Sequence, residues 1–132
     1  MSPPLVTVLL AVHKRLNYLR EALSSIAAQT FEDYEVIVAD DSGGAAANAI
    51  VAPWLAAGRL RYEPNSETVG VALSLRSALA KARGRYIAIL SDDDVWEPWF
   101  PATLLPPLEA DRRRVLTFCD HWIVWCSSGE PC

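Results

Sequence analysis

The sequence predicts an α/β protein built on a mostly parallel β-sheet with helices on both faces. Five short apolar runs have the length and branching of buried strands. Stretches with apolar residues at helical spacing separate most of them, and polar or acidic residues follow where the strand-like runs end. Strands that alternate with helices across short connections are typical of parallel sheets, because a parallel pair needs a crossover between its strands.

The composition fits one packed domain over residues 1–132. The chain has 132 residues, of which 52% are hydrophobic and only 6 are glycine, which argues against disorder. The net charge is -4, so the chain has no basic footprint for nucleic acid. Its one cationic run, Arg112–Arg114, is short enough to be a solvated helix end.

The cysteines and the first apolar run bear on localisation. Three cysteines, an odd number without metal-ligand spacing, favour reduced thiols in a cytoplasmic protein. The run Leu5–Val12 is too short to cross a bilayer and lacks a preceding cationic region, so it predicts a strand and neither a signal peptide nor an anchor. The cysteines are Cys119, Cys126 and Cys132.

The first two strands are expected at Leu5–Val12 and Tyr34–Ala39. The former is nearly continuous in apolar residues, as in an interior strand, and it ends at His13-Lys14-Arg15. Between the strands, Asn17 is a suitable cap for a helix that should end near Gln29. The second strand runs directly into a cluster of acidic and turn-forming residues.

The middle of the chain predicts two further helices around a short strand. The alanine-rich stretch Ala45–Ala57 has high helix propensity, but Pro53 should break or restart that helix. Leu60–Glu63 predicts a short strand. The following helix should run from Val69 to Gly84, which suits a left-handed C-terminal cap.

The last third predicts a central strand, a helix and a fifth strand. Tyr86–Leu90 is the central strand, and a helix should begin at Pro98, a favoured first position. The pair Pro106-Pro107 should end or kink that helix after about two turns. Val115–Cys119 is the expected fifth strand, followed by the apolar piece Trp122–Trp125 and a turn at Ser127–Gly129.

Three consecutive carboxylates, Asp92, Asp93 and Asp94, follow the central strand. Neighbouring carboxylates repel one another, so a fold keeps them at a strand end where something cationic or strongly donating lies close. Oxygen ligands suit a hard divalent ion such as Mg²⁺ or Mn²⁺, which in turn holds phosphate oxygens. The alternative is a solvated acidic turn that caps the following helix.

The expected topology gathers many polar residues at one edge of the sheet, where ligands bind in parallel α/β proteins. The first strand–helix connection has no glycine, which disfavours a dinucleotide fold, and no Walker-type phosphate loop is present. The pattern favours a nucleotide that is held by side chains and a metal ion. The residues that follow expected strands are His13, Lys14, Asp40, Asp41, Asn65, Asp92, Asp93, Asp94 and Asp120.

Four stretches of the chain together carry a resemblance to a known family: Val6–Val8 with His13, Gln29–Ser42, Gly84–Asp94, and Asp120–Val124 with Gly129-Glu130. They resemble the N-terminal half of family 2 glycosyltransferases of the GT-A fold, the nucleotide-diphospho-sugar transferase-like fold. The second and third stretches are the most specific, because they agree with the family in order, spacing and strand context. The chain departs from the family at Ser91, which stands where the metal motif has its first acid, at Arg76, which is displaced, and at the pair Pro106-Pro107.

The resemblance implies roles for particular side chains. Asp41 would bind the nucleotide base, with His13 against the base, and Asp92 would contact the ribose or the water shell of the ion. Asp93 would be the main ligand of Mn²⁺ or Mg²⁺. The implied nucleotide-binding set is His13, Asp41, Arg76 and Asp92, and the implied metal set is Asp92, Asp93 and Asp94.

The resemblance also implies an inverting transfer of a sugar from a UDP-, GDP- or dTDP-sugar to a hydroxyl of a glycan, lipid or protein acceptor. The catalytic base is expected beyond residue 132, so the catalytic residues are unknown and the chain is expected to be a truncated form of the fold. A non-catalytic nucleotide-binding fragment and a degenerate remnant are the alternatives. Membrane proximity through a partner, and self-association through an aromatic patch at Trp122 and Trp125, are further expectations.

Overall fold

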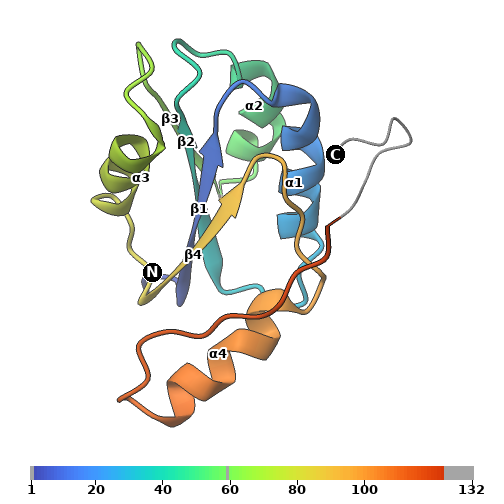
Figure 1. Ribbon diagram of the computed structural model, residues 1–132, viewed down its shortest axis with the longest axis vertical. Helices are drawn as coiled ribbons and strands as arrows, with labels where there is room; N and C mark the ends of the chain where they lie inside the picture. The colour runs from blue at the N-terminus through green and yellow to red at the C-terminus, as the bar shows by residue number, and fades with distance from the viewer. Residues whose placement is uncertain (1, 59, 124–132) are drawn as a thin grey trace.

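Four parallel strands form one sheet in the computed structural model, which describes residues 2–58 and 60–123 (Figure 1). The order across this sheet is β3-β2-β1-β4, so β1 is paired on both sides. Each strand is rich in β-branched or other apolar residues, as buried parallel strands are. Their bounds are Val6–Val12 for β1, Tyr34–Asp40 for β2, Leu60–Pro64 for β3 and Tyr86–Ser91 for β4.

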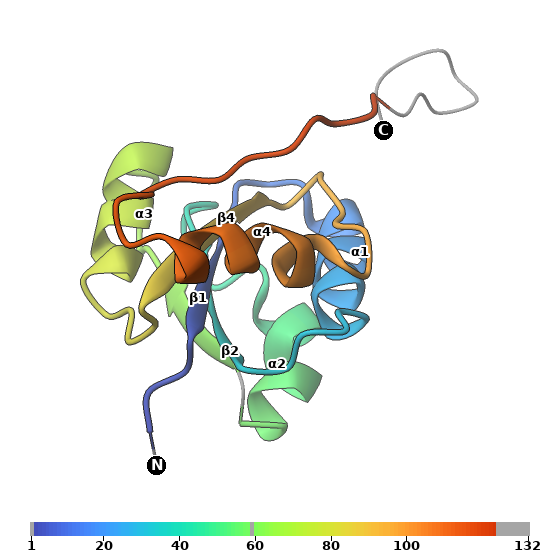
Figure 2. The same ribbon diagram turned by 90° about the horizontal axis from the view of Figure 1, so that it is seen from below.

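Helices cover both faces of the sheet, which confirms the expected fold class. Helix α3 lies on one face, and α1 and α2 lie together on the other (Figure 1). Helix α4 follows β4 and lies below the sheet in the same view, as Figure 2 shows from underneath. The helices span Leu16–Ala27 for α1, Asn48–Ala56 for α2, Val71–Leu79 for α3 and Phe100–Ala110 for α4.

Alternate residues of the strands enter two separate apolar clusters, because successive side chains of a strand point to opposite faces. Leu10 of β1 packs with Leu23 of α1 and Val51 of α2 in the larger cluster. Leu9 packs with Ile37 and with residues of α3 in the smaller one. The core is therefore deepest around β1, which holds the loop after β1 at the centre of the sheet edge.

The register places the ends of three strands side by side. Val12 at the end of β1 is opposite Asp40 of β2, and Ala11 is opposite Ser91 of β4. The loops that follow β1, β2 and β4 consequently meet at the carboxyl edge of the sheet.

The prediction of a fifth strand at Val115–Cys119 is wrong. Residues 115–119 contain no strand, and the segment runs past α4 in an extended course (Figure 2). The side chain of Val115 is 91% exposed and that of Phe118 is 84% exposed. An apolar run needs a neighbouring strand and a buried face to become a strand, and this run has neither.

Prolines were expected to interrupt two helices, but both helices continue through them. Helix α2 continues through Pro53, and α4 continues through Pro106 and Pro107 to Ala110. Each proline removes one backbone donor, a local loss. Leu105 and Leu108, which flank the pair in α4, are buried, and this packing offsets the loss.

Three helix ends also differ from the predictions. Helix α1 begins at Leu16, with Arg15 in the capping position, so Asn17 lies inside the helix. Helix α4 begins at Phe100 and not at Pro98. Helix α3 ends at Leu79, well before Gly84, because the amides of Lys81 and Ala82 bond three residues back, to the carbonyls of Ala78 and Leu79.

No helix within residues 2–58 and 60–123 has both the length and the apolar character that a membrane span requires. The expected features at Trp125, Cys126, Ser127–Gly129, Glu130 and Cys132 lie outside the described residues.

Candidate functional site

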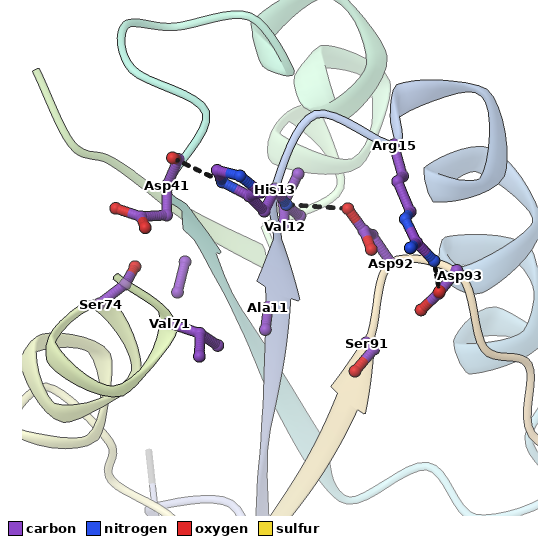
Figure 3. A pocket seen from close by; sticks show the side chains of 11 residues that line it. Ala11, Val12, His13, Arg15, Asp41, Val71, Ser74, Ser91, Asp92 and Asp93 are labelled. Atoms are coloured by element: carbon purple, nitrogen blue, oxygen red, sulfur yellow. Dashed lines mark hydrogen bonds and ion pairs between the residues drawn. The ribbon is translucent and has the colours of Figure 1, made fainter. Parts of the chain in front are cut away.

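A cavity of 250 Å³ opens at the carboxyl edge of the sheet, between the ends of β1, β2 and β4 and the start of α3 (Figure 3). Small or apolar side chains such as Ala11, Ala39 and Val71 form part of its lining. Its charged and polar lining residues are His13, Arg15, Asp41, Ser74, Ser91, Asp92 and Asp93.

The loop between β1 and α1 is tied to both neighbouring loops. The amide of His13 donates to Asp92 Oδ2 at 2.8 Å, and the amide of Lys14 donates to Ser42 Oγ at 2.9 Å. His13 Nδ1 lies 3.0 Å from the carbonyl oxygen of Asp41, which it meets as a donor because a carbonyl only accepts. Lys14 has φ 63, and in the described chain no other residue besides glycine has positive φ. This turn fixes the backbone at the centre of the cavity.

The carboxylate of Asp41 joins β2 to the start of α3. Its Oδ1 accepts from Asn65 Nδ2 at 2.8 Å and from the Val69 amide at 2.9 Å, and its Oδ2 accepts from the Gly70 amide at 2.8 Å. Burial raises the pKa of Asp41, but these hydrogen bonds outweigh it and hold the pKa below the usual range. Asp41 is therefore ionised at neutral pH and is a buried anchor of α3 as well as a cavity residue.

Asp40 supports the loop after β2 from beneath. It is fully buried and accepts from the amide of Ser42 and from the hydroxyl of Tyr62, the latter at 2.6 Å. Burial and this hydrogen bond raise the pKa of Tyr62. Asp40 is not part of the cavity lining, so its role is to hold the turn that presents Asp41.

Asp92 and Asp93 face the cavity from the end of β4 (Figure 3). Burial raises the pKa of Asp92, although the amides of His13 and Arg15 oppose the rise. Asp93 forms an ion pair with the guanidinium of Arg15. Asp94 is exposed and does not line the cavity, and its amide closes the turn by bonding to the carbonyl of Ser91.

The carboxylates fit a metal ion that is shared with a diphosphate. In the part of the chain that the structure describes, no three His, Cys, Asp or Glu side chains form a group able to hold an ion alone. Mg²⁺, however, is bound in phosphate sites through one or two carboxylates together with phosphate oxygens. Asp92 and Asp93 supply two carboxylates at one cavity wall.

The structure brings some of the expected site residues together and leaves others apart. His13, Asp41, Asp92 and Asp93 line one cavity. Arg76 is exposed on α3 and does not line it. Asp120 was expected after a fifth strand, but it follows no strand and is exposed.

Sequence reasoning missed two polar residues of the cavity. Arg15 directly follows Lys14 in the connection after β1, and this position after a strand is the signal that could have marked it. Ser74 is buried in the first turns of α3 and accepts from Asn65 Nδ2 at 3.1 Å. No sequence pattern singles it out, because a serine in a helix is ordinarily a solvated residue.

Comparisons with known proteins identify a family and several relatives. The family model described as Glycosyl transferase family 2 matches residues 7–121. A protein of Rickettsia prowazekii described as an uncharacterized glycosyltransferase is 28% identical over 124 residues, which cover 92% of this chain and 37% of the relative. The protein CgeD of Bacillus subtilis is 30% identical over 100 residues, which cover 70% of this chain and 24% of the relative.

Solved structures share the fold. TarS of S. aureus has a TM-score of 0.73 at 21% identity over 83% of this chain, and a mannosyltransferase of Pyrobaculum calidifontis, solved with GDP-Man and Mn²⁺, has 0.72 at 24% identity over 82%. The match covers 33% of each of those chains, so this chain spans about a third of their length. The likeness to these structures shows the fold, and the family match over residues 7–121 establishes that the chain belongs to glycosyl transferase family 2.

Proposed function

We propose that this chain binds a nucleotide-sugar donor together with Mn²⁺ or Mg²⁺, as the donor-binding part of an inverting glycosyltransferase that acts on an acceptor hydroxyl. The observation that carries the proposal is the convergence of His13, Asp41, Asp92 and Asp93 on one cavity in a member of this family. Structural neighbours solved with GDP-Man and Mn²⁺ or with UDP-GlcNAc support the class of donor.

The proposed nucleotide contacts are those that the family resemblance implies, and the geometry of the cavity supports two of them. Asp41 is ionised and fixed by three donors, and its Oδ2, with one donor recorded, has capacity to accept from a nucleobase. His13 directs Nδ1 to the Asp41 carbonyl, so the ring edge beyond it is available to the base. Asp92 is the proposed contact of the ribose or of the water shell of the ion. Arg76 remains a prediction as a diphosphate contact that the cavity lining does not support.

Asp93, with help from Asp92, is the proposed metal ligand, and Asp94 is the weaker member of the set. A divalent ion bound there supplies positive charge against the negative charge that develops on a departing nucleoside diphosphate. The residues of this chain hold the ion and orient the donor.

The acceptor side of the proposal is less specific. The acceptor is a glycan, lipid or protein hydroxyl, and the catalytic base is proposed to lie in sequence beyond the match to this chain, since the relatives are about three times longer. A cytoplasmic location, membrane proximity through a partner and self-association belong to the same proposal.

The test is binding of UDP, GDP and dTDP to the full chain by calorimetry with Mn²⁺ and after chelation. We expect at least one nucleotide to bind in a metal-dependent way, and Asp93→Asn to weaken that binding about tenfold or more because a charged ligand is lost. Asp33→Asn is the matched control, since Asp33 is an exposed aspartate at the opposite end of β2. Nucleotide affinity that is unchanged by chelation and by Asp93→Asn would contradict the metal assignment.

A further inference from the structure

Arg15 stands where the proposed function places a divalent ion. Its guanidinium pairs with Asp93 Oδ2 across the cavity wall (Figure 3). Asp93 forms no other ion pair with the described residues. The guanidinium of Arg15 therefore contacts the same carboxylate that is the proposed ligand of the divalent metal ion.

The fold fixes the backbone of Arg15, whereas its guanidinium is held through the ion pair with Asp93. The left-handed turn at Lys14 and the amide bonds of His13 and Lys14 hold the backbone just before Arg15. Arg15 is the capping residue of α1, but its side chain makes no capping hydrogen bond. The guanidinium can consequently leave Asp93 by side-chain rotation alone, without a change in the loop.

The pair has the exposure of an exchangeable contact. The side chain of Arg15 is 59% exposed and that of Asp93 is 25% exposed. Pairs with this much solvent contact contribute little net stability, because water screens them and two long side chains lose freedom. A divalent ion that arrives with a diphosphate brings a stronger charge and further ligands, so it can displace the guanidinium.

The ion pair of Arg15 and Asp93 also reduces the repulsion between neighbouring carboxylates. Asp92 and Asp93 are adjacent at the cavity wall, and Asp94 follows them, so their charges repel. Arg15 offsets part of this repulsion when no ion is bound. Because of this contact, a metal ion without nucleotide must compete with Arg15 for the carboxylate of Asp93.

We propose that Arg15 is an exchangeable counter-ion, which occupies Asp93 in the empty protein and yields it to the divalent ion when the metal and nucleotide bind. This inference rests on the proposed function and adds to it a role for Arg15 and an expectation for metal affinity. We expect a metal ion without nucleotide to bind weakly, because it must first displace Arg15 from Asp93.

The test is a titration of the full chain with Mn²⁺ alone, in which electron paramagnetic resonance counts the free ion. We expect Arg15→Gln to tighten the Mn²⁺ dissociation constant about three- to tenfold, because the competitor is gone. Arg15→Lys should stay near wild type, since it keeps the charge. Arg20→Gln is the matched control, an exposed arginine of α1 outside the cavity lining, and should change the constant less than about twofold.

Circular dichroism and melting curves of each variant first establish that it is folded. Equal Mn²⁺ affinity in wild type and Arg15→Gln, equal tightening by Arg20→Gln, or no Mn²⁺ binding by either wild type or Arg15→Gln would each overturn the exchange. Metal-dependent nucleotide binding, measured in parallel, separates the two proposals. If the titration contradicts the exchange but nucleotide still binds in a metal-dependent way, only the role of Arg15 is wrong. If neither wild type nor Arg15→Gln binds nucleotide in a metal-dependent way, the proposed function itself is wrong.

Discussion

At the scale of single residues, Asp41 has a structural role in addition to the base contact proposed for it. The family resemblance implies that Asp41 contacts the nucleotide base, and the sequence places Asp40 and Asp41 together in a turn after the second strand. In the structure Asp40 does hold the turn, and Asp41 also anchors α3 through the amides of Val69 and Gly70. A carboxylate after a strand is visible in a sequence, but the amides that it accepts from depend on how a distant helix docks.

Replacing Asp41 tests this anchoring role. Asp41→Asn should lower the free energy of unfolding by about 1 to 3 kcal/mol, because an amide group then faces donors that a carboxylate satisfied. Asp33→Asn, which makes the same change at an exposed position, should leave it nearly unchanged. Chemical denaturation measures both. Equal stability of the two variants would contradict the anchor.

The same residue predicts a pH dependence with a definite sign. The pKa of Asp41 in the folded protein lies below its usual value of about 3.9. Its contribution to stability is therefore present above about pH 4 and is lost as the pH falls through the folded pKa. Melting temperatures from pH 7 to pH 2 should fall less steeply at the acid end in Asp41→Asn than in wild type. Parallel curves would exclude the contribution.

At the scale of elements, the strand ends that carry the site could be predicted because buried strands leave an apolar run that ends abruptly. Val6–Val12, Tyr34–Asp40 and Tyr86–Ser91 lie within a residue of the predicted strands. The same signal failed at Val115–Cys119, where no strand or helix covers the run. Local sequence gives the propensity of an element, whereas its neighbours decide whether it forms.

Gly84 shows a second kind of failure. It was expected to cap a helix, but the structure uses it where the chain enters β4 close against β1. Its amide donates to Thr7 Oγ1 at 2.8 Å, and a Cβ there would lie 2.6 Å from the carbonyl carbon of Val6. The glycine is required by a close approach of two backbones, which sequence position alone does not reveal.

A substitution at Gly84 should therefore be costly for steric reasons. Gly84→Ala forces β1 and the start of β4 apart, and we expect it to lower the free energy of unfolding by ~3 kcal/mol or more. Gly44→Ala is the control, because Gly44 has φ +95 with no atom near its added Cβ, and should cost about 1 to 2 kcal/mol. Denaturation curves decide, and a smaller loss at Gly84 than at Gly44 would contradict the close approach.

At the scale of the whole molecule, the sheet is covered unevenly. Helix α3 covers β1 and β2, but Ile89 of β4 on the same face is 59% exposed. Leu116 and Trp122 of the last described segment are also exposed. The expectation of self-association rested on an aromatic patch at Trp122 and Trp125, of which Trp122 is exposed and Trp125 lies outside the described residues.

The fold class and the edge of the sheet that holds the site followed from the sequence, because alternation of strands and helices fixes where strand ends meet. Which of the gathered residues line the cavity did not follow. The lining depends on the direction of each side chain, which places Arg15 and Ser74 inside the site and Arg76 and Asp94 outside the lining.

The location of bound metal is the most direct test of the central claim that Asp92 and Asp93 hold a metal–nucleotide complex. The measurement is the nuclear magnetic resonance spectrum of ¹⁵N-labelled protein with a nucleoside diphosphate and either Mn²⁺ or Mg²⁺. We predict that Mn²⁺ broadens the amide signals of His13, Asp92 and Asp93 selectively, while those of Asp33 and Gly84 at the opposite end of the sheet stay sharp. Broadening centred on that opposite end, or none at His13 and Asp93 while nucleotide is bound, would contradict the account.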